Sequence, residues 1–355
     1  MRLLVLPGDG IGPEITAATL TVLRKVADVF GFPLEFQEEA VGHVSLQQYG
    51  TTVRPNLLDL ARSADGLILG PAATFDFRDP AKGEINPSAF FRKSLDLFAN
   101  IRPCRTWPGL PQKLGAFDLV IARENTEGFY ADRNMVQGNG EMQVTEDVVI
   151  SLRRVTRKAC ARIAKVAFEL AQQRRKHVTA VHKANVLKLG DGMFLDECRK
   201  LQRQFPGVTL DELIVDAAMA HLIRHPQDFD VIVTTNMYGD IISDMTAEAS
   251  GSLGLGGSLN AGDNYAMAQA SHGSAPDIAG RNIANPFSLI LSAAQLLDWL
   301  GRRKGQSGCC EAASAITRAI ENAVVAGEIT RDIGGRLGTK ETGEALARQI
   351  ENDRN

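Results

Sequence analysis

Long apolar runs are missing from this sequence. The first apolar run, residues 3–6, stops at Pro7, whereas a helix that spans a membrane needs roughly 20 such residues. The first residues also lack the basic start, apolar run and small-residue cleavage site of a signal peptide. We therefore expect no membrane partner and a cytoplasmic location.

Cysteine is scarce and scattered. The five cysteines are Cys104, Cys160, Cys198, Cys309 and Cys310. None has a CxxC or Cys/His spacing typical of a zinc site. An odd, dispersed set predicts reduced thiols rather than a disulfide framework.

An excess of charge of one sign is also absent. The 39 lysines and arginines stand against 42 acidic residues, for a formal net charge of −3. This near balance provides no general attraction for a polyanion. We therefore expect no nucleic-acid partner.

What the sequence does contain is an alternation of short β-branched runs with longer amphipathic stretches, which predicts an α/β fold with a largely parallel sheet. The expected strands lie at residues 2–6, 66–70, 119–122, 178–181 and 231–234. Helical spacing covers residues 14–29 and 148–173, and the glycine-rich run 251–262 predicts a loop. With 355 residues the chain exceeds the ~250–300 at which single cores usually divide, so two domains are expected.

The glycine-rich turn after the first strand, from Gly8 to Gly12, does not match a Rossmann dinucleotide site. The GxGxxG pattern requires a third glycine where this chain has Pro13. No acidic residue ends a clear second strand about twenty positions later. The turn must therefore serve another purpose.

Three arginines suggest a site for a di- or tricarboxylate. Arg92 lies on a helical stretch, Arg102 precedes a proline, and Arg123 ends an expected strand. A planar guanidinium matches a carboxylate bidentately. Each arginine alone is more often a surface ion pair, and Tyr130 alone more often packs as an aromatic residue.

Acidic residues and a lysine follow other expected strands. Asp240 and Asp244 share one face of a helix, where a divalent cation would relieve their repulsion, although acids also suit a helix start. Asp216 is a candidate third carboxylate. Lys183 is a candidate proton carrier.

Six ordered motifs together resemble the β-decarboxylating dehydrogenases, the family of isocitrate, isopropylmalate, homoisocitrate, tartrate and D-malate dehydrogenases. The resemblance covers nearly the whole chain. Its motifs are LPGDGIGPEIT from Leu6, LDLFANIRP from Leu95, RENTEGFY from Arg123, HKANVLK from His182, TTNMYGDIISD from Thr234 and HGSAPDIAGRNIANP from His272.

The resemblance implies an isopropylmalate dehydrogenase-like, non-Rossmann fold of two domains with a mixed, largely parallel sheet. Residues 1–99 and 252–355 would form the first domain, on the cofactor side. Residues 100–251 would form the second, with the metal site and the contacts of a homodimer or higher homo-oligomer.

It also implies roles for single residues. Arg92, Arg102 and Arg123 would hold the carboxylates of a small hydroxy acid. The metal, Mg²⁺ or Mn²⁺, would be held by Asp240 and Asp244 with Asp216 of the partner subunit. Lys183, also from the partner, would take the hydroxyl proton, and Tyr130 would protonate the enol after decarboxylation.

The cofactor implied is NAD. Asp277 lies where NAD-dependent members carry an acid for the ribose hydroxyls, and a carboxylate there repels the 2′-phosphate of NADP. The expected cofactor-binding residues are Ile11, His272, Gly273, Ser274, Ala275, Asp277, Ile278 and Asn285.

Substrate choice is expected to depend on the helix that carries Arg92. Ser88 and Asn86 favour isocitrate or a small polar 3-substituent over isopropyl, although nearby phenylalanines offer apolar walls. Gln269, Ala270 and Ser271 stand where many relatives read Glu-Pro-Val. The alternatives to an isopropylmalate- or isocitrate-type enzyme are a tartrate or D-malate dehydrogenase and, less favoured, a non-catalytic regulatory subunit.

Overall fold

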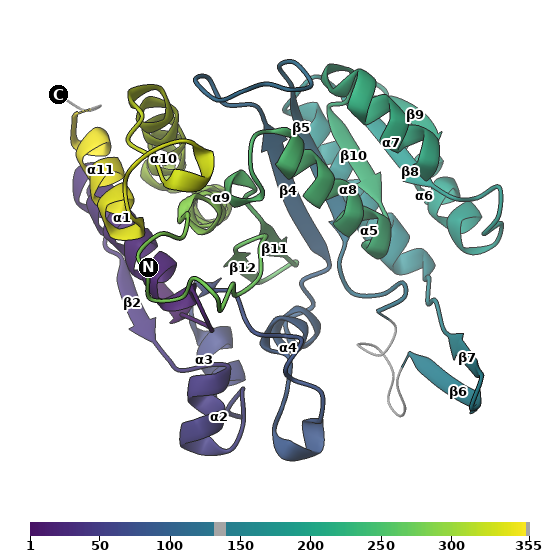
Figure 1. The fold of residues 1–355 in the computed structure, drawn as a ribbon. Helices are drawn as coiled ribbons and strands as arrows, with labels where there is room; N and C mark the ends of the chain where they lie inside the picture. Colours follow the sequence, from purple (N-terminus) through teal and green to yellow (C-terminus); the bar gives the residue numbers. More distant parts are fainter. Residues whose placement is uncertain (131–139, 353–355) are drawn as a thin grey trace.

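Strands and helices alternate along the chain (Figure 1) in the computed structural model, which describes residues 1–130 and 140–352. The strands are β1 Arg2–Leu6, β2 Glu35–Glu38, β3 Gly66–Leu69, β4 Ala99–Arg105, β5 Asp118–Glu124, β6 Glu141–Thr145, β7 Val148–Ser151, β8 His177–His182, β9 Thr209–Ile214, β10 Val231–Thr234, β11 Leu259–Ala261 and β12 Ala266–Gln269. The α-helices are α1 Gly12–Phe30, α2 His43–Tyr49, α3 Leu57–Ser63, α4 Pro87–Ser94, α5 Arg157–Gln172, α6 Gly190–Gln204, α7 Val215–Arg224, α8 Asn236–Ala249, α9 Phe287–Lys304, α10 Ser307–Ala326 and α11 Thr339–Asn352.

Ten strands of the described chain form one mixed sheet in the order β2-β1-β3-β12-β11-β4-β5-β10-β8-β9. Most neighbours are parallel, whereas β11 pairs antiparallel with β12 and β4, and β4 with β5. The expected α/β fold with a mixed, largely parallel sheet is confirmed. Strands β6 and β7 form a separate two-stranded ribbon that extends away from the body (Figure 1).

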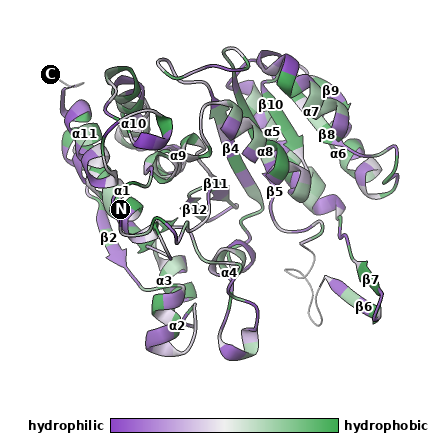
Figure 2. Cartoon of the chain, in the orientation of Figure 1, coloured by the Kyte–Doolittle hydropathy of each residue, from purple (hydrophilic) through white to green (hydrophobic). Residues whose placement is uncertain are grey.

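Helices cover both faces of the sheet. In β10, Val231 and Val233 pack in the same core as α5 and α6, whereas Ile232 packs on the opposite face with α7 and α8. A strand that is buried on both faces has a continuous run of apolar residues, whereas a strand with one exposed face alternates apolar and polar residues. Figure 2 shows this contrast between the hydrophobic β10 and the hydrophilic edge strand β2.

Two predicted elements were wrong. Residues 148–151 form strand β7 rather than helix, and α5 starts only after Thr156, whose side chain accepts a hydrogen bond from the Ala159 N–H. A run of β-branched residues favours a strand once a partner strand is available. The glycine-rich run 251–262 is not a simple loop, because it contains β11, which pairs with strands on both sides.

The turn after β1 is fixed by contacts within the protein. Gly10 has φ +57°, and a Cβ there would lie 2.0 Å from the carbonyl oxygen of Ser274. The Asp9 carboxylate accepts hydrogen bonds from the backbone N–H of His43 (2.7 Å) and Ala73 (2.9 Å). Gly10 therefore permits close packing between this turn and the loop that contains Ser274.

Four of the five cysteines are buried, and Cys310 is partly exposed. All five are free. Burial raises the pKa of Cys104 to about 11 and that of Cys160 to about 12, so both thiols stay protonated at neutral pH. No helix in the described ranges is long and apolar enough to cross a membrane.

Candidate active site

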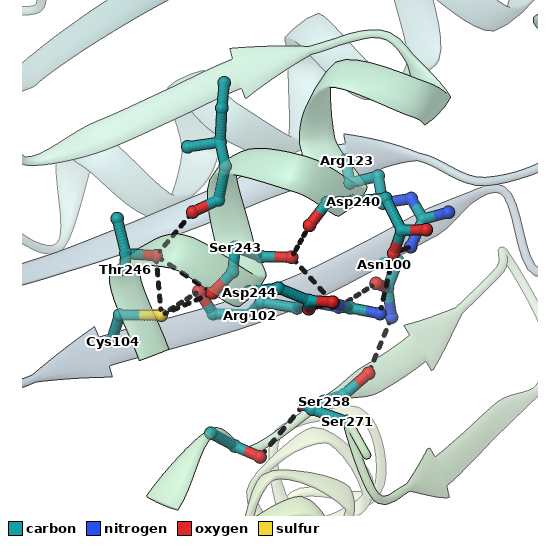
Figure 3. A network of polar contacts seen from close by, with 12 residues as sticks. Asn100, Arg102, Cys104, Arg123, Asp240, Ser243, Asp244, Thr246, Ser258 and Ser271 are labelled. Atoms are coloured by element: carbon teal, nitrogen blue, oxygen red, sulfur yellow. Dashed lines mark hydrogen bonds and ion pairs between the residues drawn. The ribbon is translucent and has the colours of Figure 1, made fainter. Parts of the chain in front are cut away.

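Two buried arginines and two aspartates meet where β4, β5 and α8 come together (Figure 3). Arg102 donates to Asp244 Oδ1 (2.9 Å) and lies 3.4 Å from Asp240 Oδ1. Arg123 forms an ion pair with the same oxygen of Asp240, and the Tyr130 hydroxyl lies 3.3 Å from its other oxygen. Arg102, Arg123, Tyr130, Asp240 and Asp244, which come from three separate motifs, therefore meet within one chain.

The surroundings shift the pKa values of Asp240 and Asp244 in opposite directions. Burial by itself raises the pKa of Asp240, but the cations Arg123, Arg102 and Arg92 outweigh it and hold that pKa below its usual value. Burial dominates at Asp244 and raises its pKa, with the neighbouring Asp240 charge adding to the rise. Asp240 is thus the more firmly ionised of the pair at neutral pH.

Neutral side chains that the sequence did not single out orient these arginines. Asn236, fully buried at the first position of α8, accepts hydrogen bonds from Arg123 Nε (3.0 Å) and Nη2 (2.7 Å). Asn100 accepts from Arg102 Nε (2.7 Å) and donates to Ser258 and Asn260 across the neighbouring strand β11. The guanidinium planes are therefore fixed independently of any ligand.

A second polar group joins α4 to the end of β12. Ser88 and Arg92, one turn apart on α4, both donate to the amide oxygen of Gln269, at 3.1 and 3.0 Å. All three are nearly buried. Asn86 is the N-cap of this helix, and its side-chain Oδ1 accepts a hydrogen bond from the Ala89 N–H (3.1 Å). From the sequence, Gln269 was noted only because many relatives have glutamate at this position, just before the loop expected to bind the cofactor.

Lys183 and Asp216 lie together, in a separate cluster. Lys183 follows β8, Asp216 is the second residue of α7, and their side chains form an ion pair that lowers the pKa of Asp216. The backbone N–H of Lys183 donates to the fully buried carboxylate of Asp191 (2.6 Å), which Arg153 also contacts. Asp191 thus positions the lysine, a role without a signal in the sequence beyond its place in the first turn of α6.

The two acids of the RENTEGFY motif have structural roles. Glu124 accepts from the backbone N–H of Thr126 (2.7 Å) and of Glu127 (3.0 Å). Glu127 accepts from the N–H and the hydroxyl of Thr156, and burial raises its pKa. They hold the chain that presents Tyr130 rather than joining the carboxylate cluster.

The loop expected to bind the cofactor lies against the turn after β1. The Ile11 N–H donates to the Ser274 carbonyl (2.8 Å), although the Ile11 side chain is buried in the core. Asn285 is engaged with Asp332 and with the Phe287 N–H at the start of α9. The remaining expected residues, His272, Gly273, Ser274, Ala275, Asp277 and Ile278, stay on one loop that is at least partly accessible.

This loop contains a buried polar atom that lacks a partner. His272 Nδ1 lies 3.0 Å from the Gly273 carbonyl, whereas Nε2 has no hydrogen-bond partner among the described residues. Burial lowers the pKa of His272, which favours the neutral ring. A neutral imidazole nitrogen of this kind suits a hydrogen bond to a bound heterocycle.

Within residues 1–130 and 140–352, no three potential metal ligands lie close enough to hold one ion. Asp240 and Asp244 provide two carboxylates, the hard oxygen ligands that Mg²⁺ and Mn²⁺ prefer. Asp216 pairs with Lys183 instead. Among the described residues, the cluster therefore brings together two such carboxylates, Asp240 and Asp244.

The comparisons with known proteins agree with this fold. Residues 2–346 match the family model described as isocitrate/isopropylmalate dehydrogenase. The chain is 38% identical to the 3-isopropylmalate dehydrogenase of Methanothermobacter thermautotrophicus over 99% of both chains, and 38% identical to the isocitrate/homoisocitrate dehydrogenase of Thermus thermophilus over 98% of both. The crystal structure of isocitrate dehydrogenase from Methylococcus capsulatus superposes with a TM-score of 0.86 at 34% identity, covering 98% of this chain and 99% of that one.

The chain belongs to the isocitrate/isopropylmalate dehydrogenase family. It is therefore an enzyme of the dehydrogenase class. The family expected from the six motifs is confirmed.

Proposed function

We propose that this enzyme catalyses the NAD-dependent, divalent-metal-assisted oxidative decarboxylation of a 3-substituted malate, giving a 2-oxo acid and carbon dioxide. The observation that carries the proposal is the convergence of Arg102, Arg123 and Tyr130 on Asp240. The named relatives, which include isopropylmalate, isocitrate and homoisocitrate dehydrogenases, support the same reaction class.

In this proposal Arg92, Arg102 and Arg123 bind the substrate carboxylates and orient the hydroxyl-bearing carbon. Lys183 takes the hydroxyl proton as the C–H hydride leaves. When bound, NAD would supply the hydride acceptor, and a divalent metal held by Asp240 and Asp244 would supply positive charge that stabilises a developing enolate. Tyr130 returns a proton to the carbon from which carbon dioxide has left.

The residues present fit both absent groups. Asp240, with its lowered pKa, and Asp244 offer anionic oxygens to Mg²⁺ or Mn²⁺. The unpartnered Nε2 of His272 and the exposed carboxylate of Asp277 suit the adenine and ribose of NAD. A carboxylate at Asp277 disfavours the additional phosphate of NADP.

We further propose that two subunits complete each site, with Lys183 and Asp216 of one facing Asp240 of the other. Most of the exposed large apolar side chains belong to residues 100–251, among them Leu189 (89% exposed) beyond Lys183 and Ile223 on α7. The β6–β7 ribbon also exposes apolar residues, and an isolated two-stranded ribbon is marginally stable in water. A second copy of the chain would cover both surfaces.

Substitution of Val149 by aspartate should therefore weaken the dimer. This β7 residue is 58% exposed in the chain, and a buried charge opposite the partner ribbon is costly. We expect a dimer dissociation constant at least roughly tenfold higher by analytical ultracentrifugation, equivalent to about 1.4 kcal/mol. Val325→Asp, at a valine on α10 that is 67% exposed, is the matched control and should leave the dimer unchanged. Equal weakening by both substitutions would exclude the ribbon as the interface.

The substrate pocket is lined by polar groups on its α4 side. Ser88, Arg92 and Gln269 favour a polar or carboxylated 3-substituent over an isopropyl group. Tartrate and D-malate remain the alternative substrates. We also propose that residues 1–99 with 252–355, and residues 100–251, form the two domains. Their largest cores are separate clusters, although Trp107 and Leu110 pack in the first core and Phe98 and Ala99 in the second.

The test is an assay with NAD and Mg²⁺ or Mn²⁺ against 3-isopropylmalate, isocitrate, homoisocitrate, D-malate and tartrate, following NADH and carbon dioxide together. One preferred substrate with equal release of both products is the expected result. NADH without carbon dioxide would exclude decarboxylation, and activity with NADP alone would exclude the assignment of Asp277.

On the preferred substrate, Asn236→Ala should lower kcat/KM at least about tenfold, because hydrogen bonds to a charged group contribute about 1.5–3 kcal/mol. The lost acceptor leaves the Arg123 guanidinium without its main positioning contact. Steady-state kinetics checks this result. Asn56→Ala, at an exposed asparagine whose side chain caps nothing, is the control, and an equal loss there would show an unspecific effect.

A further inference from the structure

A cleft of about 750 Å³ lies on the face of the sheet opposite the candidate active site. The alternation of side chains along β4 shows this directly. Asn100 and Arg102 face the carboxylate cluster, whereas Ile101, Pro103 and Arg105 line the cleft. Helix α5 forms one wall, and α9 and α10 form the other. We call this space the back cleft.

The lining of the back cleft combines apolar and aromatic side chains with charged ones. It includes Ile101, Leu170 and Leu259 together with Trp107 and Trp299, the only tryptophans in the sequence. Its volume lies within the ~300–1,000 Å³ of small-molecule sites. Two polar contacts join its walls, Arg302 to Gln173 (2.5 Å) and Arg105 to Glu321 (2.7 Å).

One cation of the cleft lacks an acidic partner. Arg302 pairs with Asp298, Arg174 with Asp118, and Arg105 with Glu321. Arg303 lies over the Trp299 ring, 4.6 Å from its centroid, and no carboxylate of the described chain is within ion-pair distance of it. An indole face beside an available guanidinium suits a ligand with a ring and one anionic group.

We propose that the back cleft binds a small amphipathic monoanion, an aromatic or branched apolar body that carries one carboxylate or sulfonate. The body packs against Trp299, Leu170 and Leu259, and the anionic group pairs with Arg303. A dianion is disfavoured because the other arginines are already neutralised and the acid Asp263 also lines the cleft. This site is separate from the proposed catalytic one.

The probe is 8-anilinonaphthalene-1-sulfonate, added to the full-length enzyme in the presence of saturating NAD. We expect saturable dye fluorescence and quenching of tryptophan emission, since both tryptophans line the cleft. 4-Phenylbutyrate should displace the dye, and 4-phenylbutylamine, its cationic counterpart, should not. Equal displacement by both compounds, or no saturable binding, would overturn the proposal.

Substitutions of cleft residues test whether the dye binds in the back cleft. Arg303→Gln should weaken dye binding at least tenfold, whereas Arg348→Gln, at an exposed arginine on α11 outside the cleft, should not. Val166→Phe, which adds bulk to the α5 wall, should also weaken it, with circular dichroism confirming the fold. Unchanged binding in both cleft variants would place the dye elsewhere and overturn the assignment.

The back cleft and the active site are also expected to influence each other, because they use alternate residues of β4 and β5. Binding linkage is reciprocal. The preferred substrate should therefore shift the half-saturating dye concentration at least threefold, and an unchanged value would exclude this linkage. That arm rests on the proposed substrate, whereas the displacement and variant arms need no substrate and no turnover, so the two failures are distinguishable.

Discussion

Replacing Lys183 by alanine is expected to lower kcat by roughly 1,000-fold, within the range that a positioned general base contributes. Among the described residues, Lys183 is the base that is fixed at the end of β8. Its side chain forms an ion pair with Asp216, and its backbone N–H donates a hydrogen bond to Asp191. Substrate binding by the three arginines should persist, so KM should change much less than kcat. Stopped-flow measurement of NADH formation checks the chemical step directly.

The same variant tests whether the site is shared. In a refolded mixture of Lys183→Ala and Asp240→Asn subunits, heterodimers carry one intact site, formed by the lysine of one chain and the aspartate of the other. Half of randomly formed dimers are heterodimers, so the mixture should regain roughly a quarter of wild-type activity.

The matched control mixes Tyr130→Phe with Asp240→Asn. These two residues contact each other within one chain, so each heterodimer site retains one defect and no activity should return. Rescue in both mixtures, or in neither, would contradict a site shared in the proposed way.

Much of this site could be predicted because its residues follow sheet strands. Arg123 lies at the end of β5, Lys183 follows β8, and Asp240 lies in the first turns of the helix after β10. Parallel strands bring such residues to one edge of a sheet. Local sequence therefore indicated which residues lie at the ends of strands, and the six motifs added their expected roles. Within one chain, Arg123 and Asp240 meet, whereas Lys183 lies in a separate cluster with Asp216.

Residues that position the others could not be predicted in the same way. Asn236, Asp191 and Gln269 act through partners 113, 8 and 177 residues away in sequence. The role of a buried polar residue can be assigned only when its hydrogen-bond partner is known, because burying a polar group without such a partner costs free energy. The short β11 was missed for a related reason, because pairing on both sides, rather than its own propensity, makes it a strand.

Gln269→Glu is expected to raise KM at least about 30-fold. Gln269 Oε1 accepts from Arg92 and Ser88 as a neutral amide, so it orients the guanidinium without cancelling its charge. A glutamate there would pair with Arg92 and compete with the substrate carboxylate. Charge-assisted hydrogen bonds of this kind contribute about 2 kcal/mol, which corresponds to roughly 30-fold in affinity.

Gln269→Met separates charge from hydrogen bonding, because it keeps the size of the side chain and removes its acceptor without adding a charge. We expect a smaller rise in KM, roughly tenfold or less, from the loss of the two orienting hydrogen bonds. The measurement is KM and kcat for both variants over the substrate panel. Substrates with a third carboxylate should lose most in Gln269→Glu, because the added charge repels that group as well. Equal effects of the two variants would mean that orientation of Arg92, rather than its charge, governs substrate binding at this side of the site.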